Sequence, residues 1–225
     1  MDKAKDAIEA KIIGVTQPVV DYIPDPEGII SYCARVSNPD NQENFKTADK
    51  LLAYCAKHGH WSVFEMANAV IEIKVPRDIS RQVLRHKSSQ FQEFSQRYAE
   101  VDESMFVLRE ARLQDDKNRQ NSIDLNDSGL QDAWEERQRE VIRKAVKEYQ
   151  WALSNHIAKE CARVVLPEGN TMSNMYMNAN MRTWLHYVGL RSGNGTQKEH
   201  IWLAELCREA LRDTFPNLIK MLEEQ

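Results

Sequence analysis

The sequence lacks the features that mark membrane and secreted proteins. No stretch approaches the roughly 18 consecutive apolar residues that a membrane-spanning helix needs. The first segment, MDKAKDAIEAK, alternates acidic and basic residues and has no apolar run of the kind found in signal peptides. No internal repeat or low-complexity tract is present. We therefore expect a cytoplasmic protein that does not use a membrane.

Cysteine is scarce and dispersed. The four cysteines are Cys33, Cys55, Cys161 and Cys207, and none forms a CxxC pair. This spacing argues against a zinc ribbon or a disulfide framework and fits a reducing compartment. No evident activating group flanks any of them, so structural thiols are expected rather than a nucleophile.

Positive charge is not in excess, and the usual nucleotide-binding loops are missing. The net charge of −4 gives no general attraction for nucleic acid. There is no GxGxxG after a strand, no GxxxxGK[ST] loop, no GxSxG and no kinase signature. Any anion site must therefore be built from local clusters of side chains.

Length and hydrophobic periodicity predict one domain, residues 1–225, of the α+β class. The chain has 225 residues, 42% hydrophobic and 28% charged, which suits one sizeable core. Strands are predicted at 11–23 and 68–75, and helices at 47–58, 78–86, 134–165, 177–190 and 196–213. The helix at 134–165 is expected to be amphipathic, with at most one break. The polar segment 114–132 is expected to be a loop or insertion, and a turn is expected at 192–195. Early strands followed by late helices indicate a small sheet packed by helices.

Two of these helices have predicted starts, and one carries a basic face. Thr47 is a plausible N-cap, and Asp78 is expected to cap the short helix that follows. On that helix Arg77, Arg81 and Arg85 recur every four residues on one side. Like charges at this spacing repel, so an anion or a carboxylate partner is expected nearby. The residues alone favour a solvated basic face.

The segment 92–98 offers a second cluster. If it is extended, Glu93, Ser95 and Arg97 point to the same side. Such a trio can hold a phosphate through Arg97 and Ser95 while Glu93 orients a second arginine or a sugar hydroxyl. The alternative is a polar strand face on the outside of a sheet, and the residues do not decide between the two.

A third cluster lies near the end of the predicted helix 177–190. Asn178, Arg182 and His186 would share one face, and Arg191 ends the element. A cationic helix end compensates the helix dipole. Alternatively, Arg182 and His186 could hold a cofactor's phosphates or ring edge.

His58-Gly59-His60 is the remaining motif with chemical potential. An HxH pair suggests a metal, but the sequence offers no matching ligand set, so no metal site is predicted. A neutral histidine that donates to a ligand's phosphate or carbonyl is the alternative.

At RHKSSQFQEFSQRY, residues 85–98, the sequence resembles the flavin-dependent thymidylate synthases. Their signature is RHR, seven or eight residues, then Ser, commonly continued by x-Arg-Tyr. Here Arg85-His86-Lys87, seven residues, Ser95 and Arg97-Tyr98 match it, with Lys87 in place of the third residue. Four further segments match in the family's order: CARVSNP at 33–39, HGHWSVFE at 58–65, ARVVLP at 162–167 and NMRTWLHYVGLR at 180–191.

The resemblance implies a reaction and an assembly. The reaction is the reductive methylation of dUMP to dTMP, a step of nucleotide biosynthesis. It uses methylenetetrahydrofolate, FAD and NADPH, releases tetrahydrofolate and needs no cysteine nucleophile. The assembly is a homotetramer with FAD and active sites at subunit interfaces. The fold is a small twisted antiparallel or mixed sheet flanked by helices. Neither nucleic acid nor a membrane is an expected partner.

The resemblance also implies roles for individual residues. The expected dUMP contacts are Gln82, Arg85, Glu93, Ser95, Arg97, Arg163 and Arg191. The expected FAD contacts are Ser37, His60, Arg85, His86, Lys87, Glu93, Asn180, Arg182 and His186. The catalytic assignments are Arg191, Ser95 and His86. Arg191 would polarise the uracil, and Arg97 with Ser95 would hold the phosphate.

Two rival functions come from other classes. One is a non-catalytic RNA- or nucleotide-binding module on the arginine face, which the acidic balance and the lack of stacking aromatics disfavour. The other is a helical scaffold that uses 134–165 as an oligomer interface. A visible spectrum separates all three, because only the flavoenzyme should purify yellow.

Overall fold

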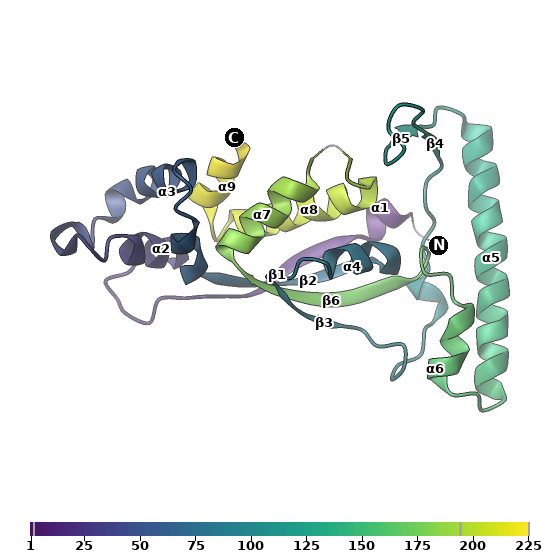
Figure 1. The fold of residues 1–225 in the computed structure, drawn as a ribbon. Helices are drawn as coiled ribbons and strands as arrows, with labels where there is room; N and C mark the ends of the chain where they lie inside the picture. Colours follow the sequence, from purple (N-terminus) through teal and green to yellow (C-terminus); the bar gives the residue numbers. More distant parts are fainter. Residues whose placement is uncertain (2, 194, 225) are drawn as a thin grey trace.

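An antiparallel sheet lies at the centre of the protein. The computed structural model describes residues 1, 3–193 and 195–224. Within them the main sheet has the strand order β1-β2-β6-β3 (Figure 1). The strands are β1 (Glu9–Val15), β2 (Asn68–Pro76), β6 (Met172–Asn180) and β3 (Gln90–Glu93). Together with the helices around it, this sheet confirms the predicted α+β class in its antiparallel form.

The helices gather on one face of this sheet and at its two ends. They are α1 (Ala4–Ala7), α2 (Pro26–Ala34), α3 (Ala48–Lys57), α4 (Arg77–Val83), α5 (Ser128–Ser154), α6 (Lys159–Ala162), α7 (Met181–Arg191), α8 (Lys198–Arg212) and α9 (Pro216–Glu223). Short 3-10 turns include η3 (Trp61–Met66) and η5 (Arg163–Val165). In Figure 1, α7 and α8 cover one face of the sheet, α2 and α3 lie at one end, and α5 stands beyond the other end, across the strand direction.

The core forms where alternate strand residues face α7 and α8. Ile71, Ile73 and Val75 of β2 are fully buried, and so are Met175 and Met177 of β6. Burying one such side chain contributes about 1.5–3 kcal/mol, so this face fixes the register of the strands.

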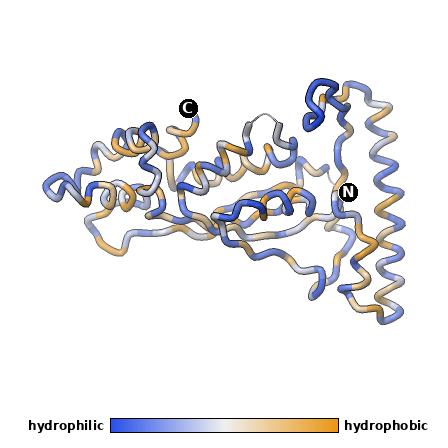
Figure 2. Tube along the Cα trace, viewed as in Figure 1, coloured by the Kyte–Doolittle hydropathy of each residue, from blue (hydrophilic) through white to orange (hydrophobic). Residues whose placement is uncertain are grey.

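A second apolar cluster joins α5 to the segment 101–108, and Figure 2 shows apolar and polar residues alternating along α5. The predicted amphipathic character of this helix is confirmed.

The strand β6 corrects the prediction of a helix from 177. Its sequence MSNMYMNAN has period two, with Met175, Met177 and Ala179 buried and Tyr176 exposed. Because β6 pairs with β2 along its whole length, from Asn68–Asn180 to Pro76–Met172, tertiary pairing overrides the helix tendency of methionine. The helix begins only at Met181, where Asn180 Oδ1 accepts a hydrogen bond from the backbone N–H of Thr183 at 3.0 Å.

Several other boundaries also differ from the predictions. The first strand ends at Val15 and does not continue to 23, and the helix expected at 78–86 spans only Arg77–Val83. Thr47 occupies the predicted N-cap position of α3, but its hydroxyl makes no capping bond and accepts from Arg35 Nη2 at 2.8 Å. Asp78 is not a cap, because it lies inside α4, and its carboxylate accepts from Arg109 Nη1 at 2.9 Å. Both polar groups serve longer-range contacts, which a local pattern does not reveal.

The long helix is broken once, as anticipated, but it starts earlier than predicted. It begins at Ser128, because Asp127 Oδ1 accepts from the backbone N–H of Leu130 at 3.0 Å, and it ends at Ser154 before α6. The polar segment 114–132 therefore contains the end of a short hairpin, β4 (Arg112–Gln114) with β5 (Ser122–Asp124), and the first turn of α5. The helix predicted at 196–213 is α8, and Asn194 of the predicted turn lies outside the described residues. None of the described helices is long and apolar enough to cross a bilayer.

Candidate active site

The carboxylate of Glu93 ends β3 and organises the arginines of α4. Its Oε1 accepts from the hydroxyls of Ser80 and Ser173, both at 2.8 Å. Arg81 donates from Nη1 to Oε2 at 3.0 Å and from Nη2 to Oε1 at 3.3 Å. Charge-assisted bidentate pairs of this kind fix both partners. The expected carboxylate partner for the arginine face is therefore present.

A second carboxylate joins the same arginines, but Arg85 stands apart. Arg77, only 7% exposed, donates from Nε to Glu168 at 3.4 Å, and Arg81 donates from Nε to the same side chain at 3.2 Å. Because α4 ends at Val83, Arg85 lies past the helix, and the predicted stripe of three arginines has two members. Among the described residues, the Arg85 and Lys87 side chains have no hydrogen-bond or ion-pair partner, and both are exposed.

The predicted row of Glu93, Ser95 and Arg97 does not form. The strand stops at Glu93, and the next residues turn, with the N–H of Tyr98 donating to the carbonyl of Ser95 at 3.0 Å. Arg97 Nε pairs instead with Glu160 of α6 at 3.3 Å, and both side chains are 55% exposed. The arginine therefore points toward the region of α6 and η5, where Arg163 begins the 3-10 turn.

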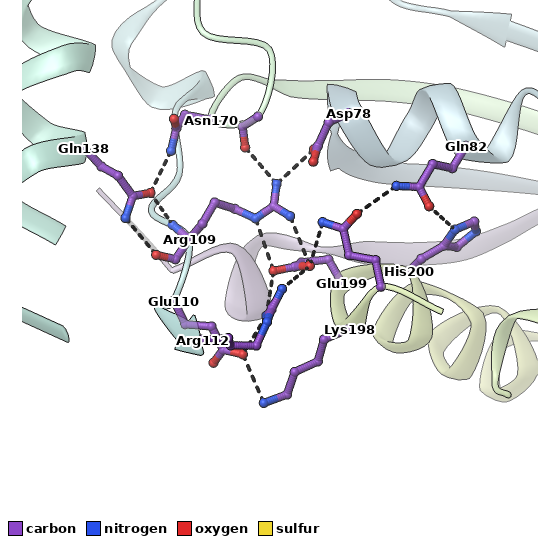
Figure 3. A network of polar contacts seen from close by, with 12 residues as sticks. Asp78, Gln82, Arg109, Glu110, Arg112, Gln138, Asn170, Lys198, Glu199 and His200 are labelled. Atoms are coloured by element: carbon purple, nitrogen blue, oxygen red, sulfur yellow. Dashed lines mark hydrogen bonds and ion pairs between the residues drawn. The ribbon is translucent and has the colours of Figure 1, made fainter. Parts of the chain in front are cut away.

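A cluster of polar rings lies between the ends of α4 and α7 and the start of α8. Arg191 Nε donates to His86 Nε2 at 3.0 Å, and the His86 ring packs edge-on against Tyr187 with centroids 4.8 Å apart. The Tyr187 hydroxyl lies 3.1 Å from His200 Nε2. The other ring nitrogen, His200 Nδ1, lies 3.2 Å from Gln82 Oε1 (Figure 3). Gln82, His86 and Arg191, three of the predicted site residues, thus occupy one connected cluster.

Electrostatics in this cluster favour neutral imidazoles beside a cation. Burial, reinforced by the charge of Arg191, lowers the pKa of His86 to about 4. Burial and Arg191 lower the pKa of His200 to about 3. Both rings are neutral at pH 7, and among the described residues no carboxylate pairs with Arg191. Arg191 therefore keeps an uncompensated positive charge.

The other predicted FAD residues lie at the start of α7, on α7 and in the region of α3 and η3. Ser37 lines an open cavity of about 460 Å³ with Lys50 and Tyr54, and the His60 ring lies 6.1 Å from Tyr54. Arg182 pairs with Glu65 of η3 at 2.5 Å. His186 is exposed one turn further along α7.

The expected face of Asn178, Arg182 and His186 needs correction. Asn178 belongs to β6 and pairs with Val70 and with Gln90, so only the other two residues lie on α7. Asn180 precedes them, and its side-chain oxygen accepts the hydrogen bond that caps α7. The rings of His58 and His60 are 6.3 Å apart, and among the described residues no three acidic, histidine or cysteine side chains are grouped to hold a metal.

Some residues of these clusters had no signal in the sequence. Glu168, Gln197, His200 and Tyr187 reach the predicted residues only through the fold; Gln82, for example, contacts Gln197 across 115 positions and His200 across 118. Charge or spacing could have suggested Glu168 as a partner for arginine, but nothing local distinguishes Gln197.

Comparisons with known proteins agree with this picture. Residues 18–217 match the family described as thymidylate synthase complementing protein. A probable flavin-dependent thymidylate synthase of Paramecium bursaria Chlorella virus 1 is 49% identical, covering 96% of this chain and 99% of its own. The flavin-dependent thymidylate synthase of Synechocystis sp. is 44% identical, covering 96% and 100%.

The solved structure of a UMP/dUMP methylase from Streptomyces cacaoi bound with 5-Br UMP has a TM-score of 0.83. It covers 96% of this chain and 94% of its own at 22% identity, which speaks for a shared fold. The resemblance found in the sequence is thus confirmed, and the chain belongs to the thymidylate synthase complementing protein family, which includes the flavin-dependent thymidylate synthases.

Proposed function

We propose that this enzyme, a flavin-dependent thymidylate synthase by family, converts dUMP into dTMP with methylenetetrahydrofolate, FAD and NADPH and releases tetrahydrofolate. Two relatives of that name match nearly the whole chain at 49% and 44% identity. The observation within the structure that carries the proposal is Arg191, a half-buried cation whose contact is a neutral histidine. Its charge is available to a ligand.

Arg191 suits the pyrimidine because methylation at C5 needs an electron-rich uracil. Negative charge develops on the uracil as the carbon becomes nucleophilic, and a preorganised cation stabilises that charge. His86 receives one N–H of Arg191 and, being neutral, does not cancel its charge. His86 therefore orients the guanidinium, and Gln82 lies in the same cluster to contact the base.

The phosphate of dUMP would be held by Arg85, Arg97 and Arg163 with Ser95. The Arg97–Glu160 pair is more than half exposed on both sides, so the contact is weak and a phosphate can displace it. Among the described residues, the Arg163 side chain has no hydrogen-bond or ion-pair partner. Both cations can thus bind an anion at small cost.

We infer assembly into a homotetramer, and the same placement supports contacts between subunits. Among the described residues of one chain, no hydrogen bond or ion pair joins Arg97 or Arg163 to the cluster around Arg191. Tyr98 is 79% exposed and Val164 is 83% exposed, and each sits next to one of these arginines. Exposed apolar side chains beside ligand-binding cations favour a subunit contact, so that each active site combines several chains.

The residues present fit FAD. The cavity beside Ser37 offers polar groups and Lys50, and Tyr54 and His60 offer ring faces next to it. Lys87 is an exposed cation that can meet a phosphate as a point charge, without the fork of an arginine. The proposed set is completed by Arg85, His86, Glu93, Asn180, Arg182 and His186. When bound, FAD supplies the hydride that completes the reduction.

No cysteine is assigned to the chemistry. Burial raises the pKa of Cys55 and Cys207, which keeps these thiols protonated and poor as nucleophiles. All four cysteines are free of disulfides, in line with a cytosolic location.

A visible spectrum tests the proposal. The purified protein, dialysed against FAD and freed of excess, should show flavin absorbance, and addition of dUMP should perturb it. A colourless protein that leaves the fluorescence of added FAD unchanged over a full titration would overturn the assignment.

A further inference from the structure

A buried anion anchors one end of a hydrogen-bonded chain that reaches the candidate active site. The Glu199 carboxylate is 1% exposed and is held by Arg109 and Arg112 (Figure 3). Arg112 donates from Nη1 to Oε1 and from Nη2 to Oε2, both at 2.9 Å. Although burial raises the pKa of Glu199, the two arginines outweigh it and lower the pKa to about 2. At neutral pH this carboxylate can only accept hydrogen bonds.

That restriction fixes the orientation of the next amide. Gln197 Nε2 lies 3.1 Å from Glu199 Oε2, so the amide nitrogen must face the carboxylate. The Gln197 oxygen then points the other way and accepts from Gln82 Nε2 at 2.8 Å. An unanchored glutamine could present either end to Gln82, but this one presents its oxygen.

The same direction continues through Gln82 to the rings. With its nitrogen facing Gln197, the Gln82 oxygen accepts from His200 Nδ1 at 3.2 Å. His200 is fully buried and neutral, so a proton on Nδ1 leaves Nε2 bare to accept from the Tyr187 hydroxyl at 3.1 Å. Every donor in this series of hydrogen bonds, from the Tyr187 hydroxyl to the Gln197 amide, therefore points toward Glu199.

We infer that Gln197, anchored by Glu199, is a positioning residue that holds the amide of Gln82 in one orientation for the pyrimidine of dUMP. This inference rests on the proposed function. Gln82 keeps one N–H and one carbonyl lone pair that the chain does not use. A neighbouring donor and acceptor complement the carbonyl and N3–H of uracil, and a flipped amide would exchange their places.

A double-mutant cycle on dUMP kinetics tests the inference. The variants are Gln82→Met, Gln197→Met and the double variant, with Gln17→Met at an exposed position as the matched control. Gln197→Met should lower kcat/KM for dUMP about twofold to tenfold, the equivalent of one neutral hydrogen bond. Because Gln197 acts through Gln82, the double variant should match Gln82→Met, and Gln17→Met should match the wild type.

Two outcomes separate this inference from the proposed function. If the wild type forms dTMP but the two losses multiply in the double variant, or Gln197→Met has wild-type kinetics, the positioning role is wrong and the proposed function stands. If the flavin-loaded wild type forms no dTMP, the proposed function fails and the dUMP role fails with it.

Neutron diffraction from crystals of the full-length protein observes the amide orientations and the proton positions directly. This measurement needs no variant, so it does not depend on the activity or the folding of one. Nitrogen, oxygen and deuterium scatter differently, so the orientation of each amide is observed directly. Deuterium should lie on His200 Nδ1 and not on Nε2, and the Gln82 nitrogen should face Gln197. A Gln82 oxygen facing Gln197, or deuterium on His200 Nε2, would overturn the inference.

Discussion

Mild acid should destabilise the folded protein through His200. The side chain is completely buried between Gln82 and Tyr187, and burial together with the charge of Arg191 lowers its pKa to about 3. An unfolded histidine has a pKa of about 6.5. Between these two values the unfolded chain binds a proton that the folded chain does not, so the free energy of unfolding falls as the pH falls.

The size of the effect follows from the two pKa values. Each pH unit in this window is worth about 1.4 kcal/mol, so acidification from pH 7 to pH 5 should remove about 2 kcal/mol. At pH 3 the accumulated loss from this one group should be about 4 kcal/mol, a large part of the stability of an ordinary domain.

Urea unfolding at pH 7 and pH 5, at one protein concentration, measures this loss in the wild type and in His200→Gln. Glutamine does not titrate and keeps a donor that can face Gln82. The wild type should lose about 2 kcal/mol more than the variant between the two pH values, whatever the other groups contribute to both. Parallel losses in the two proteins would show that His200 titrates normally and would refute the reasoning.

Three further predictions concern the proposed chemistry and its support. Replacing all four cysteines by serine should leave measurable dTMP formation; loss of turnover in a folded variant, restored by returning one cysteine, would contradict this. Arg97→Ala should mainly raise the KM for dUMP, about tenfold to a hundredfold for a charge-assisted contact, whereas Arg191→Ala should lower kcat; the reverse pattern in steady-state kinetics at matched flavin content would contradict this. Glu93→Gln should lower the free energy of unfolding by about 1.5–3 kcal/mol, because two serine hydroxyls and Arg81 lose a charged acceptor; an unchanged urea midpoint would contradict it.

Elements with strong local patterns were predictable from the sequence. The strand β2 alternates apolar and polar residues and ends at Pro76, and α8 carries an amphipathic repeat. In contrast, β6 consists mainly of methionine and asparagine, and neither residue type strongly predicts a strand or a helix in this pattern. Only its pairing with β2 and β3 fixes its state, and pairing partners about 100 positions apart leave no local trace.

The resemblance named several residues that the fold brings together, but the sequence did not reveal how they are arranged. Gln82, His86 and Arg191, which the resemblance assigns to one site, occupy one cluster in the fold, because helix ends carry them to one place. The extended conformation predicted for 92–98 is wrong beyond Glu93, where a turn follows and separates Ser95 and Arg97 from the predicted row. The anchoring role of Glu199 depends on Arg109 and Arg112, which a helix pattern around 196–213 cannot reveal.

The most direct test of the proposed function is the identity of both products of one reaction. The purified protein is supplied with dUMP, methylenetetrahydrofolate, FAD and NADPH, and nucleotides and folates are separated by chromatography and mass spectrometry. The account predicts dTMP and tetrahydrofolate in equal amounts, with neither formed when FAD has been removed. Formation of dTMP without flavin, or of dihydrofolate in place of tetrahydrofolate, would contradict it.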